Sequence, residues 1–160
     1  MRAYTLRSLV FVSLALLVMA GCSKKEKGGE SVAPQGQTVK KKTVVVVPDK
    51  VKGKWKAVKI AVTDKRVNKD TVYDIPINKE FSIPNSNLSI RVENFLPHFL
   101  MDGTTLTSQS NEPKNPAAQV LIMEGGKEVF KGWLFMLYPT THAFQHPRYG
   151  FTVVGFVPAD

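Results

Sequence analysis

Apolar and polar residues alternate with a period of two along much of the chain after residue 42. This period is typical of β-strands that bury one face and expose the other. Two segments, residues 54–62 and 88–94, show it most clearly. The inward positions that the pattern predicts in them are Val58, Ile60, Val62, Leu88, Ile90 and Val92, with Trp55, Ala57, Lys59 and Ala61 on the opposite face of the first.

Further short runs rich in β-branched and aromatic residues are bounded by Gly, Pro, Asn or Asp, which favours strands separated by turns. These runs are residues 43–47, 71–77, 80–83, 119–123, 129–137 and 151–156. Gly125 and Gly126 predict a hairpin turn between two of them. No stretch after Cys22 keeps a helical period. We therefore expect an all-β domain, a small β-sandwich or open barrel of about seven short antiparallel strands.

Residues 102–118 interrupt this pattern with a long polar segment. Pro97 predicts a break or bulge just before it, because proline cannot donate to a strand ladder. We expect a connection without strands, and a loop of that length is often part of a functional surface.

The first residues have the pattern of a bacterial export signal. Arg2 and Arg7 precede an apolar run over residues 9–19, and small residues lead into Cys22. The run has about eleven residues, too few for a membrane-spanning helix, which needs roughly 20. Met19-Ala-Gly-Cys22 resembles a lipobox, in which cleavage precedes a cysteine that is then acylated. The alternative is an ordinary secretory signal followed by an incidental cysteine.

These features divide the chain into three parts. Residues 1–21 are the expected signal peptide, residues 22–42 an acylated cysteine with a basic, disordered tether, and residues 43–160 a single β-domain. Two or more acyl chains would hold the protein stably on a membrane. Ser23, rather than an aspartate, follows the cysteine, and by resemblance to lipoprotein sorting signals this favours the outer membrane, facing the periplasm.

The net charge of +9 lies largely outside the expected β-domain. Residues 23–50 carry seven lysines against Glu26, Glu30 and Asp49, a net +4, whereas residues 51–160 carry thirteen basic and ten acidic residues, a net +3. A basic tether beside a lipid anchor favours contact with anionic lipid. Export and this charge distribution argue against nucleic acid as a partner.

The last third of the chain contains a group of aromatic, proline and histidine residues. Phe130-Lys-Gly-Trp-Leu-Phe135 is followed by Pro139, Ala143 and the turn His146-Pro-Arg-Tyr149. This arrangement resembles the C-terminal signature of DUF2155, a bacterial domain family of unknown function, over about residues 52–157. The resemblance implies an exported protein without a known activity. The final strand departs from the family because it has no cysteine, so a disulfide seen in other members cannot form here.

The same region contains the candidate site residues. We expect Phe144, His146, Arg148 and Tyr149 to offer amphipathic contacts to a partner, together with residues 102–118. Trp133 fits either a core position with its indole N–H bonded or a recognition site in a groove. His142 and His146 are the candidates for metal ligands, and His98 or Tyr149 could join them only through the fold.

No catalytic signature is present in the sequence, whether a nucleophile elbow, a zinc-protease helix, a paired-cysteine motif or a phosphate-binding glycine loop. We therefore expect a lipid-anchored envelope protein whose β-domain is a non-enzymatic binding or adaptor module for another envelope protein, without a cofactor. The alternative is a periplasmic domain that binds a metal or small ligand through His142 and His146.

Overall fold

A computed structural model describes residues 42–160 of the chain. The expected signal peptide, Cys22 and all but the last residue of the expected tether lie outside the described residues. Within residues 42–160 there are ten strands and no helix, so the predicted all-β class is confirmed. Among these residues, therefore, no helix could span a membrane.

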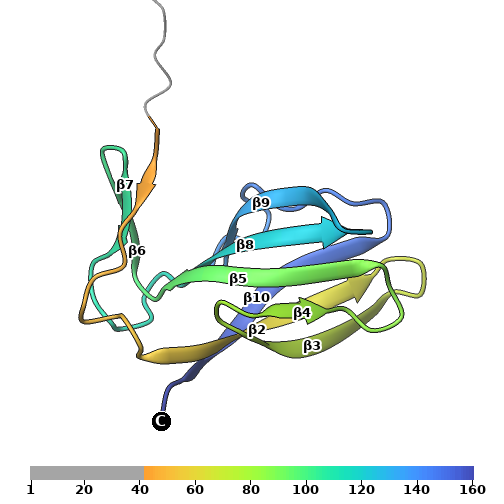
Figure 1. The fold of residues 1–160 in the computed structure, drawn as a ribbon, viewed down its shortest axis with the longest axis horizontal. Helices are drawn as coiled ribbons and strands as arrows, with labels where there is room; N and C mark the ends of the chain where they lie inside the picture. Colours follow the sequence, from red (N-terminus) through yellow and green to blue (C-terminus); the bar gives the residue numbers. More distant parts are fainter. Residues whose placement is uncertain (1–41) are drawn as a thin grey trace, which may run out of the picture. The chain divides into compact units, whose positions relative to one another are not determined.

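Two sheets face each other as a small sandwich (Figure 1). One sheet has the order β10-β2-β3 and the other β4-β5-β8-β9, with antiparallel neighbours throughout. Their strands are β2 (Trp55–Asp64), β3 (Lys69–Pro76), β4 (Glu80–Ser82), β5 (Leu88–Leu96), β8 (Ala117–Glu124), β9 (Lys127–Phe135) and β10 (Tyr149–Pro158).

Inward positions of the central strands form the core, as their alternation predicts. On β5, Leu88, Ile90 and Val92 are at most 2% exposed, and they pair with β8, whose Val120 and Ile122 are fully buried. The predicted inward face of β2 is buried in the same core. Apolar burial between two sheets is the main force that holds such a domain together.

A third, smaller sheet corrects the expectation that residues 102–118 lack strands. β6 (Phe99–Asp102) and β7 (Thr105–Ser108) form a hairpin, and β1 (Val44–Val45) pairs with β7 in parallel. The sequence pattern of β7 is weak because this strand is short and polar and buries one apolar side chain, Leu106. This small sheet lies at one end of the sandwich (Figure 1).

Other local predictions are partly confirmed. Gly125 and Gly126 both have positive φ and join β8 to β9, as the hairpin turn requires. β5 ends immediately before Pro97, and the register of β5 on β8 shifts between Val92 and Asn94. Trp55 departs from its predicted outward face, because its ring packs edge-on against Phe95 and Phe156 at the margin of the core.

Candidate functional site

An apolar groove runs beside β9 and has a volume of about 550 Å³. Three parts of the chain form it: β9, the small sheet of β6 and β7, and residues 141–143 of the loop between β9 and β10. Most of the side chains that line it are apolar or aromatic, namely Phe99, Met101, Leu106, Phe130, Trp133, Phe135 and Ala143. A concave apolar surface with few polar groups is typical of a binding site.

The side chains of β9 alternate between two faces, and the groove is lined by residues of both. Leu134 is buried in the core and Phe130 packs against it, so alternate residues turn inward. Gly132 belongs to the same inward set, and a Cβ atom there would lie 2.7 Å from Cζ of Phe130. The ring of Phe130 therefore uses the space that the glycine leaves. Lys131, Trp133 and Phe135 consequently share the outer face.

The aromatic wall of the groove joins two sheets. The ring of Phe99 lies 5.2 Å from that of Trp133 and 5.1 Å from that of Phe135, in edge-to-face geometry. Asn115 holds Phe99 in place, since its backbone carbonyl accepts the Phe99 N–H at 2.9 Å and its Nδ2 donates to the Phe99 carbonyl at 3.2 Å. β6 thus supplies one side of an aromatic cluster whose other side is β9.

Trp133 occupies this groove and is half-buried. Within residues 42–160 its indole N–H has no hydrogen-bond acceptor. Trp55 differs in this respect, because its Nε1 donates to Asn111 Oδ1 at 2.8 Å. Trp133 therefore lies in a groove and, among the described residues, lacks the bonded indole N–H of the core interpretation, while its role in recognition stays a prediction.

Phe144 and Tyr149 lie elsewhere than expected. They are 6% and 5% exposed, and both belong to the core between the sheets. The ring of Phe144 packs edge-on against Phe130 of β9 and Phe151 of β10, at 5.5 Å from each. This burial corrects the expectation that Phe144 and Tyr149 are exposed contacts. The two side chains instead close the side of the sandwich where β9 and β10 are the outer strands.

His146 stabilises the loop between β9 and β10 through hydrogen bonds to its backbone. Its Nδ1 accepts the backbone N–H groups of Arg148 at 3.1 Å and Tyr149 at 2.9 Å. Neutral His146 must therefore carry its proton on Nε2, which lies 3.5 Å from Glu124 Oε1. The ring stacks on Phe144 at 5.5 Å and on Tyr149 at the same distance. These contacts make His146 a structural residue of the turn.

The expected metal ligands are not brought together. Within residues 42–160 no three His, Cys, Asp or Glu side chains gather as a possible metal site. His142 lines the groove and has φ of 52°, whereas the Nδ1 of His146 is used by backbone donors. His98 Nδ1 lies 3.1 Å from Ser110 Oγ.

Arg148 is paired within the domain. Its Nε and Nη2 both lie within 3.0 Å of Asp64 Oδ2, and its guanidinium carbon lies 4.7 Å from the centre of the Tyr149 ring. The hydrogen bond from Arg148 holds the pKa of Asp64 below its ordinary value, and Asp64 in turn raises the pKa of Arg148. Arg148 therefore joins the start of β10 to the end of β2 and already has an acidic partner.

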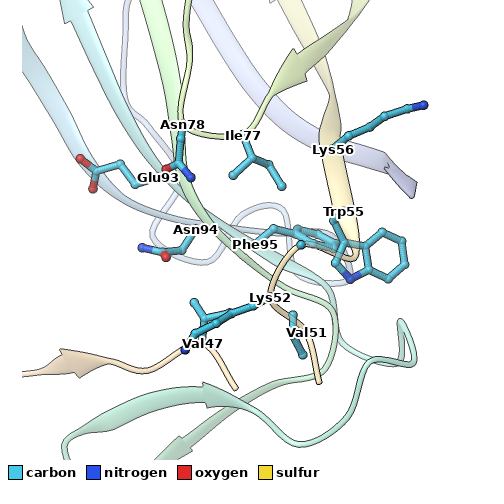
Figure 2. A pocket seen from close by; sticks show the side chains of 11 residues that line it. Val47, Val51, Lys52, Trp55, Lys56, Ile77, Asn78, Glu93, Asn94 and Phe95 are labelled. Atoms are coloured by element: carbon cyan, nitrogen blue, oxygen red, sulfur yellow. The ribbon is translucent and has the colours of Figure 1, made fainter. Parts of the chain in front are cut away.

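A second cleft, of about 430 Å³, lies between the segment that precedes β2 and residues 93–95 of β5 (Figure 2). Trp55 and Phe95 form one side, and Glu93, Asn94 and Asn78 the other. Many of its polar groups are paired: Glu93 with Lys131 at 3.0 Å, and Asn94 Nδ2 with Gln119 Oε1 at 2.7 Å. It is therefore a weaker candidate than the groove beside β9, whose tryptophan N–H is free.

Sequence reasoning identified Trp133 but missed the other walls of the groove. Phe99 and Met101 stand at alternate positions after Pro97, a short strand signal that the expected break concealed. Phe135 belongs to the quoted aromatic motif. Their juxtaposition with Trp133 depends on contacts between separate sheets, which a period along the chain does not reveal.

Comparisons of the chain with protein-family models, with curated proteins and with solved structures found no match. The likeness to DUF2155 stays a resemblance of sequence motifs.

We predict that His146→Ala lowers the free energy of unfolding by about 1–3 kcal/mol, because two backbone N–H groups lose their acceptor. His146→Asn should recover part of this loss, since the asparagine Oδ1 can accept the N–H two residues on. Urea unfolding of the full-length chain measures both. Equal destabilisation by the two variants would contradict an acceptor role and leave ring stacking as the explanation.

We also predict that Asp64→Asn destabilises the protein near neutral pH and has less effect in acid. Arg148 depresses the pKa of Asp64 only in the folded state, so the unfolded chain binds this proton at a higher pH. The stability from the pair is thus present above the ordinary Asp range and is lost as pH falls through the lowered pKa. Urea unfolding at a series of pH values tests this, with Asp70→Asn as an exposed control. If the stability difference between Asp64→Asn and the original chain does not change with pH, the prediction is contradicted.

Proposed function

We propose that the protein is a lipid-anchored cell-envelope protein whose β-domain is a non-enzymatic binding or adaptor module for another envelope protein. The anchor rests on the export signal and on the lipobox-like residues that end at Cys22. The basic residues that follow suit a tether beside anionic lipid. The residue after the cysteine favours the outer membrane, with the domain in the periplasm.

The observation that carries the binding function is the groove beside β9. It combines an aromatic wall from Phe99, Trp133 and Phe135 with a tryptophan N–H that has no acceptor among the described residues. Tryptophan in a concave apolar site is a frequent source of binding energy, because its ring buries a large area and its N–H adds direction.

Apolar side chains are exposed in the groove and in the segment that follows β9. Met101 is 59% exposed, and Leu137 and Tyr138, just beyond the end of β9, are 53% and 59% exposed. Apolar groups exposed together mark interaction sites more often than isolated ones do. A partner that covers the groove would remove Met101 from water.

The lipid anchor gives one prediction. Cys22→Ser should abolish incorporation of a clickable fatty-acid analogue in cells, because the acylated atom is the cysteine sulfur, and the chain should accumulate as a precursor. Ser23→Ala, one residue further on, is the matched control and should be labelled normally. Undiminished labelling of the Cys22→Ser chain would refute the anchor.

The groove gives a second prediction, which tests the binding function. A photo-reactive residue at Met101 should crosslink the full-length protein in cells to a discrete envelope protein, whereas one at Val67, 67% exposed in the turn after β2, should not. Trp133→Ala should weaken the Met101 adduct severalfold, since Ala removes a groove wall. Equal amounts of adduct from Met101 and Val67, or no adduct from Met101, would count against a binding groove. Thermal unfolding shows whether the Trp133→Ala variant is folded.

A further inference from the structure

The outer edge of β9 carries unpaired backbone groups. The N–H of Met136 donates to the carbonyl of Pro116 at 3.0 Å, which places this pair of residues in the hydrogen-bonded position of the ladder with β8. Alternation in an antiparallel pair then directs the N–H and C=O groups of Lys131, Trp133 and Phe135 away from β8. Within residues 42–160 no strand pairs with that side of β9.

The other outer strands of the sandwich have features that discourage pairing. β3 carries Lys69, Asp70 and Asp74 and ends at Pro76, and β4 has three residues. β10 has two register shifts and ends at Pro158. Charges, proline, short length and bulges are the means by which edge strands avoid adding another strand.

β9 has such protection only in its first half. Its register with β8 shifts near Val129, after Lys127 and Glu128. In the second half the one charge is Lys131, whose ammonium is held by Glu93 at 3.0 Å across the outer face of the sheet. An edge that, apart from the paired Lys131, lacks charges, bulges and proline and is bordered by Trp133 and Phe135 is a template on which another strand can pair.

The groove gives such a strand places for its side chains. A neighbouring strand lies about 4.8 Å from β9, and every second side chain would point to the face of Trp133 and Phe135. There Phe99 and Met101 form the opposite wall. The groove has one ammonium, already paired, so uncharged apolar side chains fit it best.

We propose that β9 binds an extended segment of a partner polypeptide as an additional strand, with alternate apolar side chains of that segment in the groove. This inference rests on the proposed binding function and names its partner as a peptide strand rather than a helix or a small ligand. Backbone pairing to residues 131–135 supplies the orientation, and the aromatic wall supplies the selectivity.

The test compares Lys131→Pro with Lys131→Ala in the purified full-length chain. Proline removes an N–H that points outward, so the ladder with β8 stays intact, while alanine removes only the side chain. The probe is a phage-displayed library of random dodecapeptides, from which the enriched peptides are synthesised and titrated. We expect apolar residues at every second position, and binding at least about tenfold weaker in Lys131→Pro than in Lys131→Ala, because both lack the lysine side chain and only proline also lacks the N–H.

A second measurement needs no variant. In the original chain, the bound peptide should slow hydrogen exchange of the Lys131, Trp133 and Phe135 amides, whereas the Gly132 and Leu134 amides are already bonded to β8. This keeps the inference testable if Lys131→Pro does not fold.

Three results would overturn the inference. If peptides bind both variants equally and do not protect these amides, the groove binds them without strand pairing. The proposed binding function would then remain. If the original chain enriches no peptide relative to a parallel selection on Lys131→Pro, strand binding itself is refuted. Self-association of the chain through β9, abolished by Lys131→Pro, would make the occupant a second copy instead. Loss of the Met101 crosslink, by contrast, tests only the proposed function.

Discussion

Period-two alternation of side chains, with one face buried between two sheets, is the constraint on which the rest of this structure depends. Ile90, Val120 and Ile122 have no exposed surface, so β5 and β8 cannot shift by one residue without turning polar side chains into the core. The register of β8 in turn fixes that of β9. Once Leu134 is inward, Trp133 and Phe135 must be outward, and the aromatic face of the groove follows from core packing.

The loop between β9 and β10 shows how the open side of such a sandwich is sealed. Two outer strands that face each other leave the core accessible to water unless a side chain fills the gap between them. Phe144 contacts both strands, and His146 holds the turn that positions it through two backbone hydrogen bonds. The residue types that suggested a binding loop therefore serve stability, while the binding surface that we propose lies on β9.

The outer edge of β9 is not sealed by a side chain in this way. Its backbone is unpaired on one side within residues 42–160, and it is flanked by aromatic rings that elsewhere would be covered. Folding alone gives no reason to keep such an edge, because exposed edges with apolar neighbours promote aggregation. The strand binding that we propose would account for the absence of charges, bulges and proline in the second half of β9, apart from the paired Lys131.

Local pattern was enough to predict the all-β class, the inward faces of β2 and β5 and the Gly125-Gly126 hairpin, because each depends on neighbours one to four residues apart. The small sheet of β1, β6 and β7, and the burial of Phe144 and Tyr149, came only from the tertiary structure. A loop has no period, so its sequence does not reveal which aromatic ring enters the core. The groove likewise required Phe99 and Trp133, from different sheets, to be placed side by side by packing.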